Sequence, residues 1–404
     1  MTAPQPATPE PVDDVSLSWG MSGSADRPAA AAPQTTAPPA PPRSTQAPGV
    51  LIRGLVDELH DTLPASWSSY LVQIAVAGAE YRTHAVAELP DGRLLPIEVS
   101  RHVLELAATH RHLTVGSAPW MWLQLTGQRG AEPQIVSYDG FVGAPPAHLL
   151  FPAETYRDDI STAEDLTQPL WLLAHLNNRG AQLRPATVAA LASPAGTVDA
   201  GTELPPLELL WPRFAALAAI FAGLDADDGP RMTSAFGVFR GEAGGCTLTR
   251  LPGGRAVLSG GADHSALMTG AYRGQLPWPD LYRGAPSWVS NIVLDERVLA
   301  GMLSFCYWFD GGRWSRAAVE GMPGWSMIDE ITPGVPGVWT TASTASLVQA
   351  TIGTVDDAVT EDQCDHYVRQ VSDGIIRPDL LLADHGPRFT AAEALTVLDL
   401  AQSW

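Results

Sequence analysis

The triplet Cys364-Asp365-His366 brings together a thiol, a carboxylate and an imidazole, the groups of a nucleophilic catalytic site. In such a site the three groups meet in space, whereas neighbours along a helix point in different directions. Asp263-His264-Ser265 fails for the same reason, and the sequence contains no GxSxG, P-loop, GxGxxG or HExxH motif. We therefore predict no catalytic residues, no cofactor and no enzymatic activity.

Metal-ligating residues are present but poorly spaced. His102 and His110 are eight positions apart on an expected helix, where a metal site needs a spacing of three or four. Short acidic runs could do acid–base chemistry or hold Mg²⁺, but each falls on an expected loop or helix start, where carboxylates favour the helix dipole. These runs are Asp158-Asp159, Asp225-Ala226-Asp227-Asp228, Asp356-Asp357 and Glu361-Asp362. We predict no metal site.

The aromatic residues carry the stronger signal, since thirteen tryptophans are many beside nine phenylalanines. Trp and Tyr are enriched at interface hot spots because they combine a large rigid surface with a polar tip. Core packing is the alternative for each of them. The predicted partner-binding residues are Trp120, Trp122, Tyr138, Asp139, Tyr156, Asp158 and Asp159.

Charge narrows the class of partner. The formal net charge is −20 and all 24 basic residues are arginine, without a basic cluster. Phosphate neutralisation needs such clusters, so we expect no nucleic-acid partner. A basic protein partner is compatible with this charge, and so is a simple role in solubility.

Three widely spaced cysteines form neither a disulfide framework nor a metal clip, which predicts reduced thiols and a cytoplasmic location. We find no signal-peptide pattern at the N-terminus. The most apolar helical stretch, residues 209–224, is too short and too polar for a membrane span. We expect no membrane association and leave the oligomeric state open.

Composition and periodicity divide the chain into four parts. Residues 1–48 are rich in Pro and Ala and are expected to be a disordered arm, which could act as a tether or a proline-rich ligand. An α+β module is expected over 50–178, a linker over 179–206, and a second α+β module with a helical C-terminus over 207–404. Because hairpins join the expected strands, both sheets should be mainly antiparallel with helices packed on them.

Periodicity also predicts the individual elements. In the first module we expect helices at 50–62, 99–113 and 169–177, and strands at 70–76, 80–89, 120–126 and 134–138. In the second we expect helices at 209–224, 342–352, 356–371 and 390–404, and strands at 235–240, 247–251, 298–309 and 313–317. Thr390 and Glu393 have the spacing of a capping box.

The turn motifs of the two modules are similar. Pro90-Asp91-Gly92-Arg93 resembles Asp310-Gly311-Gly312-Arg313, and Ala65-Ser66-Trp67 resembles Pro286-Ser287-Trp288. Either the second module is a diverged duplicate of the first, or common turn chemistry produces the likeness.

One series of short motifs runs through the first module in a fixed order. It comprises Leu63-Pro64-x-x-Trp67, the Asp91-Gly92 turn, the strand with Trp120 and Trp122, Tyr138-Asp139, Tyr156 to Asp159, and Pro169-Leu170-Trp171-Leu172. In this order the module resembles the YezG-like immunity-protein family, antitoxins that neutralise a partner toxin. The chain departs from the family in its length, in its second module and in Ser137, where the family tends to be acidic.

The resemblance implies a cytoplasmic binding protein that covers a toxin's active site, with a nuclease or an NAD-consuming toxin as possible targets. Two alternatives remain open. The chain could be an accessory or scaffold protein of a secretion or injection apparatus, tethered by residues 1–48. It could also be an enzyme with an unrecognised site in the second module, which would need a pocket where distant Asp or His side chains converge.

Overall fold

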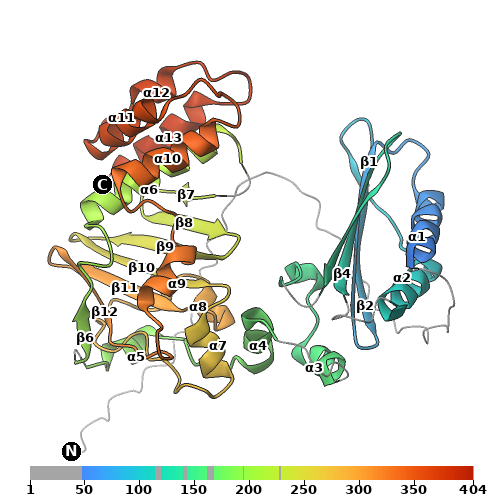
Figure 1. Cartoon of the computed structure of the whole chain (residues 1–404), viewed down its shortest axis with the longest axis horizontal. Helices are drawn as coiled ribbons and strands as arrows, with labels where there is room; N and C mark the ends of the chain where they lie inside the picture. Colours follow the sequence, from blue (N-terminus) through green and yellow to red (C-terminus); the bar gives the residue numbers. More distant parts are fainter. Residues whose placement is uncertain are drawn as a thin grey trace, which may run out of the picture.

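The computed structural model describes residues 48–113, 120–139, 143–161, 168–193, 195–226 and 229–403. The side chains of Pro48, Tyr138, Asp139, Asp158, Asp159 and Ser161 are also outside the description. The disordered arm expected over residues 1–48 therefore lies outside the described residues, apart from the backbone of Pro48. The described chain forms two units, each an antiparallel sheet with helices packed on it (Figure 1), which confirms the α+β class.

The first unit contains a five-stranded sheet in the order β3-β2-β1-β4-β5. Its strands are β1 (Ser69–Ala77), β2 (Glu80–Glu88), β3 (Leu94–Pro96), β4 (Trp120–Gln128) and β5 (Gln134–Asp139). Gly78 and Gly92 make the two tight turns with φ of 52° and 80°, values that glycine adopts without steric cost. Neighbouring strands are antiparallel, and β5 forms one edge of the sheet.

Helices α1 (Pro48–Thr62) and α2 (Arg101–Leu113) cover one face of this sheet (Figure 1). Leu51, Leu55 and Leu59 recur every four residues on α1 and are buried, as an amphipathic helix requires. Leu55 and Leu59 pack with the alternate strand residues Val72 and Ile74. This face holds the main core of the first unit.

The opposite face of the first sheet is covered at one end only. There η1 (Ala147–Leu149), α3 (Ala153–Ser161) and α4 (Leu170–Asn177) pack over Ala75 and Ala77 of β1. Helix α4 also contacts α7 of the second unit. Asn178, directly after α4, donates to the carbonyl of Leu299 at 2.8 Å, so α4 joins the two units.

The second unit contains a seven-stranded antiparallel sheet in the order β6-β12-β11-β10-β9-β8-β7. Its strands are β6 (Thr197–Asp199), β7 (Arg231–Met232), β8 (Phe236–Gly241), β9 (Gly244–Leu251), β10 (Arg255–Ala262), β11 (Phe305–Asp310) and β12 (Arg313–Ala317). Residues alternate between two cores: Phe305 and Tyr307 face one, and Cys306 and Trp308 face the other.

A layer of helices covers the Phe305 face of this sheet (Figure 1). It is formed by α6 (Leu207–Gly223), α9 (Met327–Gly334), α10 (Thr341–Ile352), α11 (Glu361–Ser372), α12 (Asp379–Leu382) and α13 (Ala391–Gln402). Helix α6 is apolar on nearly all sides because α10, α11 and α13 surround it. Short elements cover the Trp308 face, namely α7 (Ala266–Tyr272), η2 (Asn291–Val293) and α8 (Arg297–Ala300).

The stretch 179–206, expected as a linker, instead forms part of the second unit. It contains α5 (Ala186–Ala190) and β6, which pairs with β12 through Val198 and Arg316. Arg184 is buried and donates to the carbonyls of Ala285 and Val289, at 2.9 and 2.6 Å. These bonds, which periodicity does not reveal, hold the stretch against the unit.

Several element predictions in the second unit need correction. The strand expected from Val298 begins only at Phe305, because Arg297–Ala300 form helix α8. Strand β10 was not predicted, although it lies at the centre of the sheet. Helix α13 follows Thr390 as expected, but the Thr390 side chain makes no capping hydrogen bond.

The two sheets differ in their connections. In the first, the strand that follows the intervening helix, β4, pairs with β1, the first strand of the unit. In the second, β11 follows the intervening helices and pairs with β10, the strand immediately before them. A simple duplication of one module would preserve these pairings.

Within the described residues, no helix is long and apolar enough to cross a bilayer.

Candidate functional site

Trp120 and Trp122 lie on opposite faces of the first sheet, although they are two residues apart on β4. The pairing with β5 shifts between them, and such a bulge breaks the alternation of side chains. Trp120 is 1% exposed in the core beneath α1 and α2, and its indole Nε1 donates to Nδ1 of His110 at 3.1 Å. Trp122 is buried in the other core.

Tyr156 on α3 is also buried. Its hydroxyl accepts from the backbone N–H of Phe151 at 3.3 Å, and its ring makes an edge contact with Trp171. Trp120, Trp122 and Tyr156 therefore pack cores, and the prediction that they offer a surface to a partner is wrong for this structure. The reason is that aromatic composition does not distinguish a core residue from an exposed one.

The other four predicted residues are placed by their backbones alone. Tyr138 and Asp139 end strand β5, opposite Trp122 and Trp120 of β4. Asp158 and Asp159 lie in α3. Their side chains are outside the description, so their prediction as partner-binding residues stays a prediction.

Two rows of the first sheet lie beside the end that α3 and α4 cover, and η1 reaches the first row through His148, which leaves Gln73 buried. His84, Gln73, Gln124 and Val136 lie opposite one another across β2, β1, β4 and β5. The next row is formed by Val86, Leu71, Thr126 and Gln134. We call these two rows the open sheet face. Val136 is 45% exposed at its edge, whereas Leu71 and Val86 are half-buried.

A chain of polar contacts crosses the open sheet face. Gln73 Nε2 donates to Oε1 of Gln124 at 3.0 Å, and Nε2 of His148 lies 2.9 Å from Oε1 of Gln73. The rings of His148 and His84 are 4.8 Å apart between centroids. Burial, followed by repulsion from His84, lowers the pKa of His148. These side chains are held in place by one another, which gives the face a defined shape.

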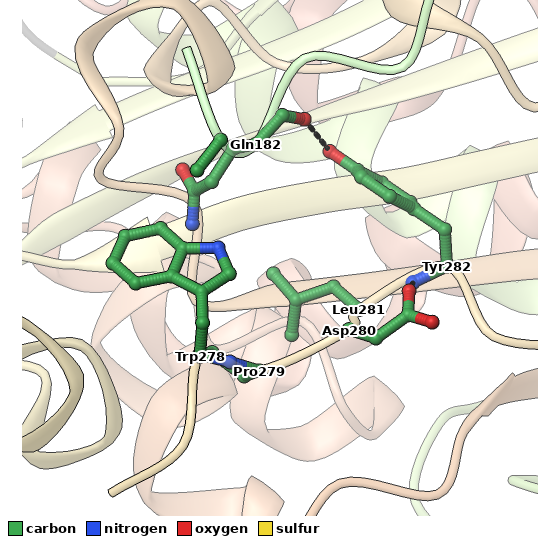
Figure 2. A pocket seen from close by; sticks show the side chains of 7 residues that line it. Gln182, Trp278, Pro279, Asp280, Leu281 and Tyr282 are labelled. Atoms are coloured by element: carbon green, nitrogen blue, oxygen red, sulfur yellow. Dashed lines mark hydrogen bonds between the residues drawn. The ribbon is translucent and has the colours of Figure 1, made fainter. Parts of the chain in front are cut away.

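A pocket of about 140 Å³ opens in the second unit (Figure 2). It is lined by Ala181, Gln182, Trp278, Pro279, Asp280, Leu281 and Tyr282. Asp280 is its only carboxylate, whereas the enzyme alternative expects several converging acidic or histidine side chains. One side of the pocket comes from residues 181–182, in the stretch expected as a linker, and the other from residues 278–282, about a hundred positions later. No local sequence motif could therefore have indicated it.

The residues of the Cys364 triplet point to separate structural partners. Cys364 is buried, and burial raises the pKa of its thiol to about 11. Asp365 pairs with Arg369 at 2.7 Å, and His366 lies 3.4 Å from Asp379. A thiol with a raised pKa is a poor nucleophile near neutral pH. The structure therefore does not bring these three groups together.

The most buried charge is Asp295, which the sequence did not single out. Its Oδ2 accepts from the Thr247 hydroxyl at 2.7 Å and lies 2.9 Å from Nη1 of Arg240. Its Oδ1 accepts from the backbone N–H of Arg297 at 3.0 Å. Because both oxygens are hydrogen-bonded, this carboxylate is compensated within the fold and joins α8 to β8 and β9.

Among the residues whose placement is described, no three His, Cys, Asp or Glu side chains gather as metal ligands would. Comparison of the chain with protein-family models, with curated proteins and with solved structures finds no match.

Proposed function

We propose that the protein is a non-enzymatic binding protein, of the immunity type, that neutralises a toxin partner. Edge strand β5 and the adjoining open sheet face are the surface through which it binds. The observation that carries the proposal is the position of β5, which pairs with β4 on one side and with no described strand on the other.

An unpaired strand edge is a ready site for an added strand from a partner. Such an edge offers a row of backbone N–H and C=O groups, and natural proteins usually protect it with Lys, Pro or a covering element. The sequence of β5, Gln134 to Asp139, contains no Pro, and the bulge in its pairing with β4 lies at one end, between Trp120 and Trp122. Val136 adds an exposed apolar side chain at this edge.

Two further features support the proposal. The two aliphatic side chains of the open sheet face, Leu71 and Val86, lie beside the fixed Gln73–Gln124 pair, so the face combines apolar area with defined hydrogen-bonding groups. An interface core of this kind, with a polar rim, is typical of protein–protein contacts. The net charge of −20 favours a basic partner.

The first test is co-expression with the product of each neighbouring gene, measuring growth and complex formation by size-exclusion chromatography. Neutralisation predicts that one product stops growth alone and is tolerated with this protein. A complex without any effect on toxicity would favour the scaffold alternative. If this protein protects against no neighbouring gene product and forms a complex with none, the proposal is contradicted.

The second test locates the surface. Val136→Arg places on the β5 edge a charge of the same sign as the proposed basic partner and should weaken the complex about tenfold or more, because like charges repel across an interface. Val188→Arg is the matched control, since Val188 is 53% exposed on α5 in the second unit. Equal affinity of the two variants would show that β5 is not the binding site.

A further inference from the structure

The pocket of Figure 2 has two aromatic walls that the fold holds in place. The Tyr282 hydroxyl donates to the carbonyl of Gln182 at 2.9 Å. The Gln182 amide in turn bonds both backbone groups of Leu303, at 2.6 and 2.9 Å. Trp278 makes an edge contact with Tyr272, with ring centroids 5.0 Å apart. Because these side chains are already ordered, a ligand would not have to order them on binding.

The lining of the pocket is mainly apolar and carries a negative charge at one end. Trp278 is 37% exposed and faces Tyr282 across the opening, with Leu281 below them (Figure 2). The carboxylate of Asp280 lies at the Tyr282 end, where its Oδ1 accepts from the Tyr282 backbone N–H at 3.1 Å. The Asp280 side chain is half exposed, and its Oδ2 lies 3.8 Å from Nε of Arg283, so a cation that enters the pocket would share this carboxylate with Arg283.

The volume limits what the pocket can hold. A volume of about 140 Å³ is well below the roughly 300 to 1,000 Å³ of typical small-molecule pockets, so the pocket has room for little more than a side chain. The pocket therefore suits a short anchoring part of a larger chain. Proline suits such a pocket, because polyproline II segments dock in aromatic-lined grooves at a low entropy cost.

The chain itself contains such a segment, Pro38-Pro39-Ala40-Pro41-Pro42-Arg43. A polyproline II helix has three residues per turn, so in that conformation two prolines three positions apart, such as Pro38 and Pro41, would share one side of the helix. We propose that the Trp278–Tyr282 pocket binds this segment, with proline rings between the two aromatic walls and the Arg43 guanidinium at Asp280. This inference is independent of the proposed function, because it concerns the other unit and a different surface.

Chain length restricts how the contact forms. Five residue steps separate Arg43 from Pro48, where α1 begins, and they span at most about 18 Å. Binding within one molecule requires the pocket to lie within that reach, whereas binding to a second copy has no such limit. The two cases share the same pocket chemistry and differ in their dependence on protein concentration.

The test uses the full chain with its own segment disabled by Pro38→Ala, Pro41→Ala and Arg43→Ala, referred to as the segment variant. A fluorescent peptide of residues 33–47 is titrated against it by anisotropy. We expect saturable binding to the segment variant and weaker binding to the wild-type chain, whose own segment competes. A scrambled peptide of the same composition should not bind. No binding to the segment variant, or equal binding of the scrambled peptide, would overturn the proposal.

Substitutions of the pocket residues, made in the segment variant, test whether the peptide binds at this pocket. Trp278→Ala should weaken peptide binding about tenfold or more, because it removes an aromatic anchor. Phe236→Ala is the control, since Phe236 is 41% exposed on β8. Asp280→Asn, at a half-exposed position that should not disturb folding, should weaken binding about two- to fivefold and reduce its salt dependence. Binding unchanged by both Trp278→Ala and Asp280→Asn would overturn the proposal.

Discussion

The guanidinium of Arg316 binds the carboxylate of Glu203 through two parallel hydrogen bonds. Nε lies 2.8 Å from Oε2 and Nη2 lies 2.7 Å from Oε1. The Tyr307 hydroxyl donates a third bond to the same carboxylate, at 2.7 Å. Both partners of the ion pair are largely buried, so the contact fastens the 199–206 stretch to strands β11 and β12.

Glu203→Gln should destabilise the second unit by about 2 to 3 kcal/mol, because it leaves Arg316 without its charged partner. Burial alone raises the pKa of Glu203, but the bonds from Arg316 and Tyr307 outweigh it and lower the pKa. Because the pKa is lower in the folded chain than in the unfolded chain, the ionised carboxylate stabilises the fold at pH values above the ordinary glutamate pKa. This stability is lost as the pH falls through the lowered pKa. Urea unfolding of the wild type and the variant across acidic pH measures both effects.

The control is Glu132→Gln, which removes an exposed carboxylate from the first unit. It should leave the free energy of unfolding nearly unchanged. If Glu203→Gln and Glu132→Gln lose stability equally, the Arg316 contact does not hold the second unit together.

Asp356 and His385 form a second pH-dependent contact, between the loop after α10 and the segment before α13. Nδ1 of His385 lies 2.7 Å from Oδ2 of Asp356, and this bond, with one from Ala358, lowers the pKa of Asp356. The contact therefore stabilises the fold above the ordinary aspartate range and weakens as the pH falls through the lowered value. Asp356→Asn should lower the Tm at neutral pH and have less effect in acid.

The neighbouring variant Asp357→Asn serves as the reference, since Asp357 is exposed. In thermal melts from neutral to acidic pH, the Tm values of the two variants should differ near neutral pH and become similar in acid. A constant difference at every pH would argue against titration of Asp356 as the cause.

Trp120→Ala should lower the stability of the first unit by about 3 to 5 kcal/mol, because it leaves a cavity in a closed core. Trp120→Phe should cost less, since it keeps most of the ring volume and loses the bond to His110. Chemical unfolding followed by circular dichroism measures both. A small loss for Trp120→Ala, comparable to that of the exposed Trp278→Ala, would indicate that Trp120 is on the surface after all.

The thiols should be unreactive in the folded protein. Cys246, Cys306 and Cys364 are all buried, and burial raises the pKa of each, to about 12 for Cys306 and about 11 for Cys364. Because the thiolate is the reactive form, a thiol reagent at neutral pH should label the native chain slowly and the unfolded chain rapidly. Rapid labelling of one thiol in the native chain would identify an exposed cysteine.

Most elements of the first unit followed from the sequence because their signals are local. The amphipathic spacing of Leu51, Leu55 and Leu59 predicts α1, and the alternation around Val72 and Ile74 predicts β1. Fewer elements of the second unit were predicted. Strand β10 contains Gly260 and Gly261, which interrupt the pattern of residues that would indicate a strand. Glycine is disfavoured in strands, and here it is required because a Cβ at Gly260 would meet the backbone of Gly245.

The candidate site was much less predictable. The aromatic character of Trp120, Trp122 and Tyr156 predicts interface residues, yet all three are buried. Val136 and Trp278 are not among the residues predicted to bind a partner, although both are exposed. Exposure is decided by which elements cover a residue, and this information is absent from the residue type.

The sequence by itself determined the α+β class, the position of most helices and hairpins, and the acidic net charge. These properties depend on local periodicity and on composition. The tertiary structure alone decided that a bulge separates Trp120 from Trp122, that 197–199 complete the second sheet, and that β5 is an edge. It also decided that Gln182 and Tyr282 meet beside a pocket. Strand order and long-range contacts arise only when distant segments pair, and no short window of sequence encodes that pairing.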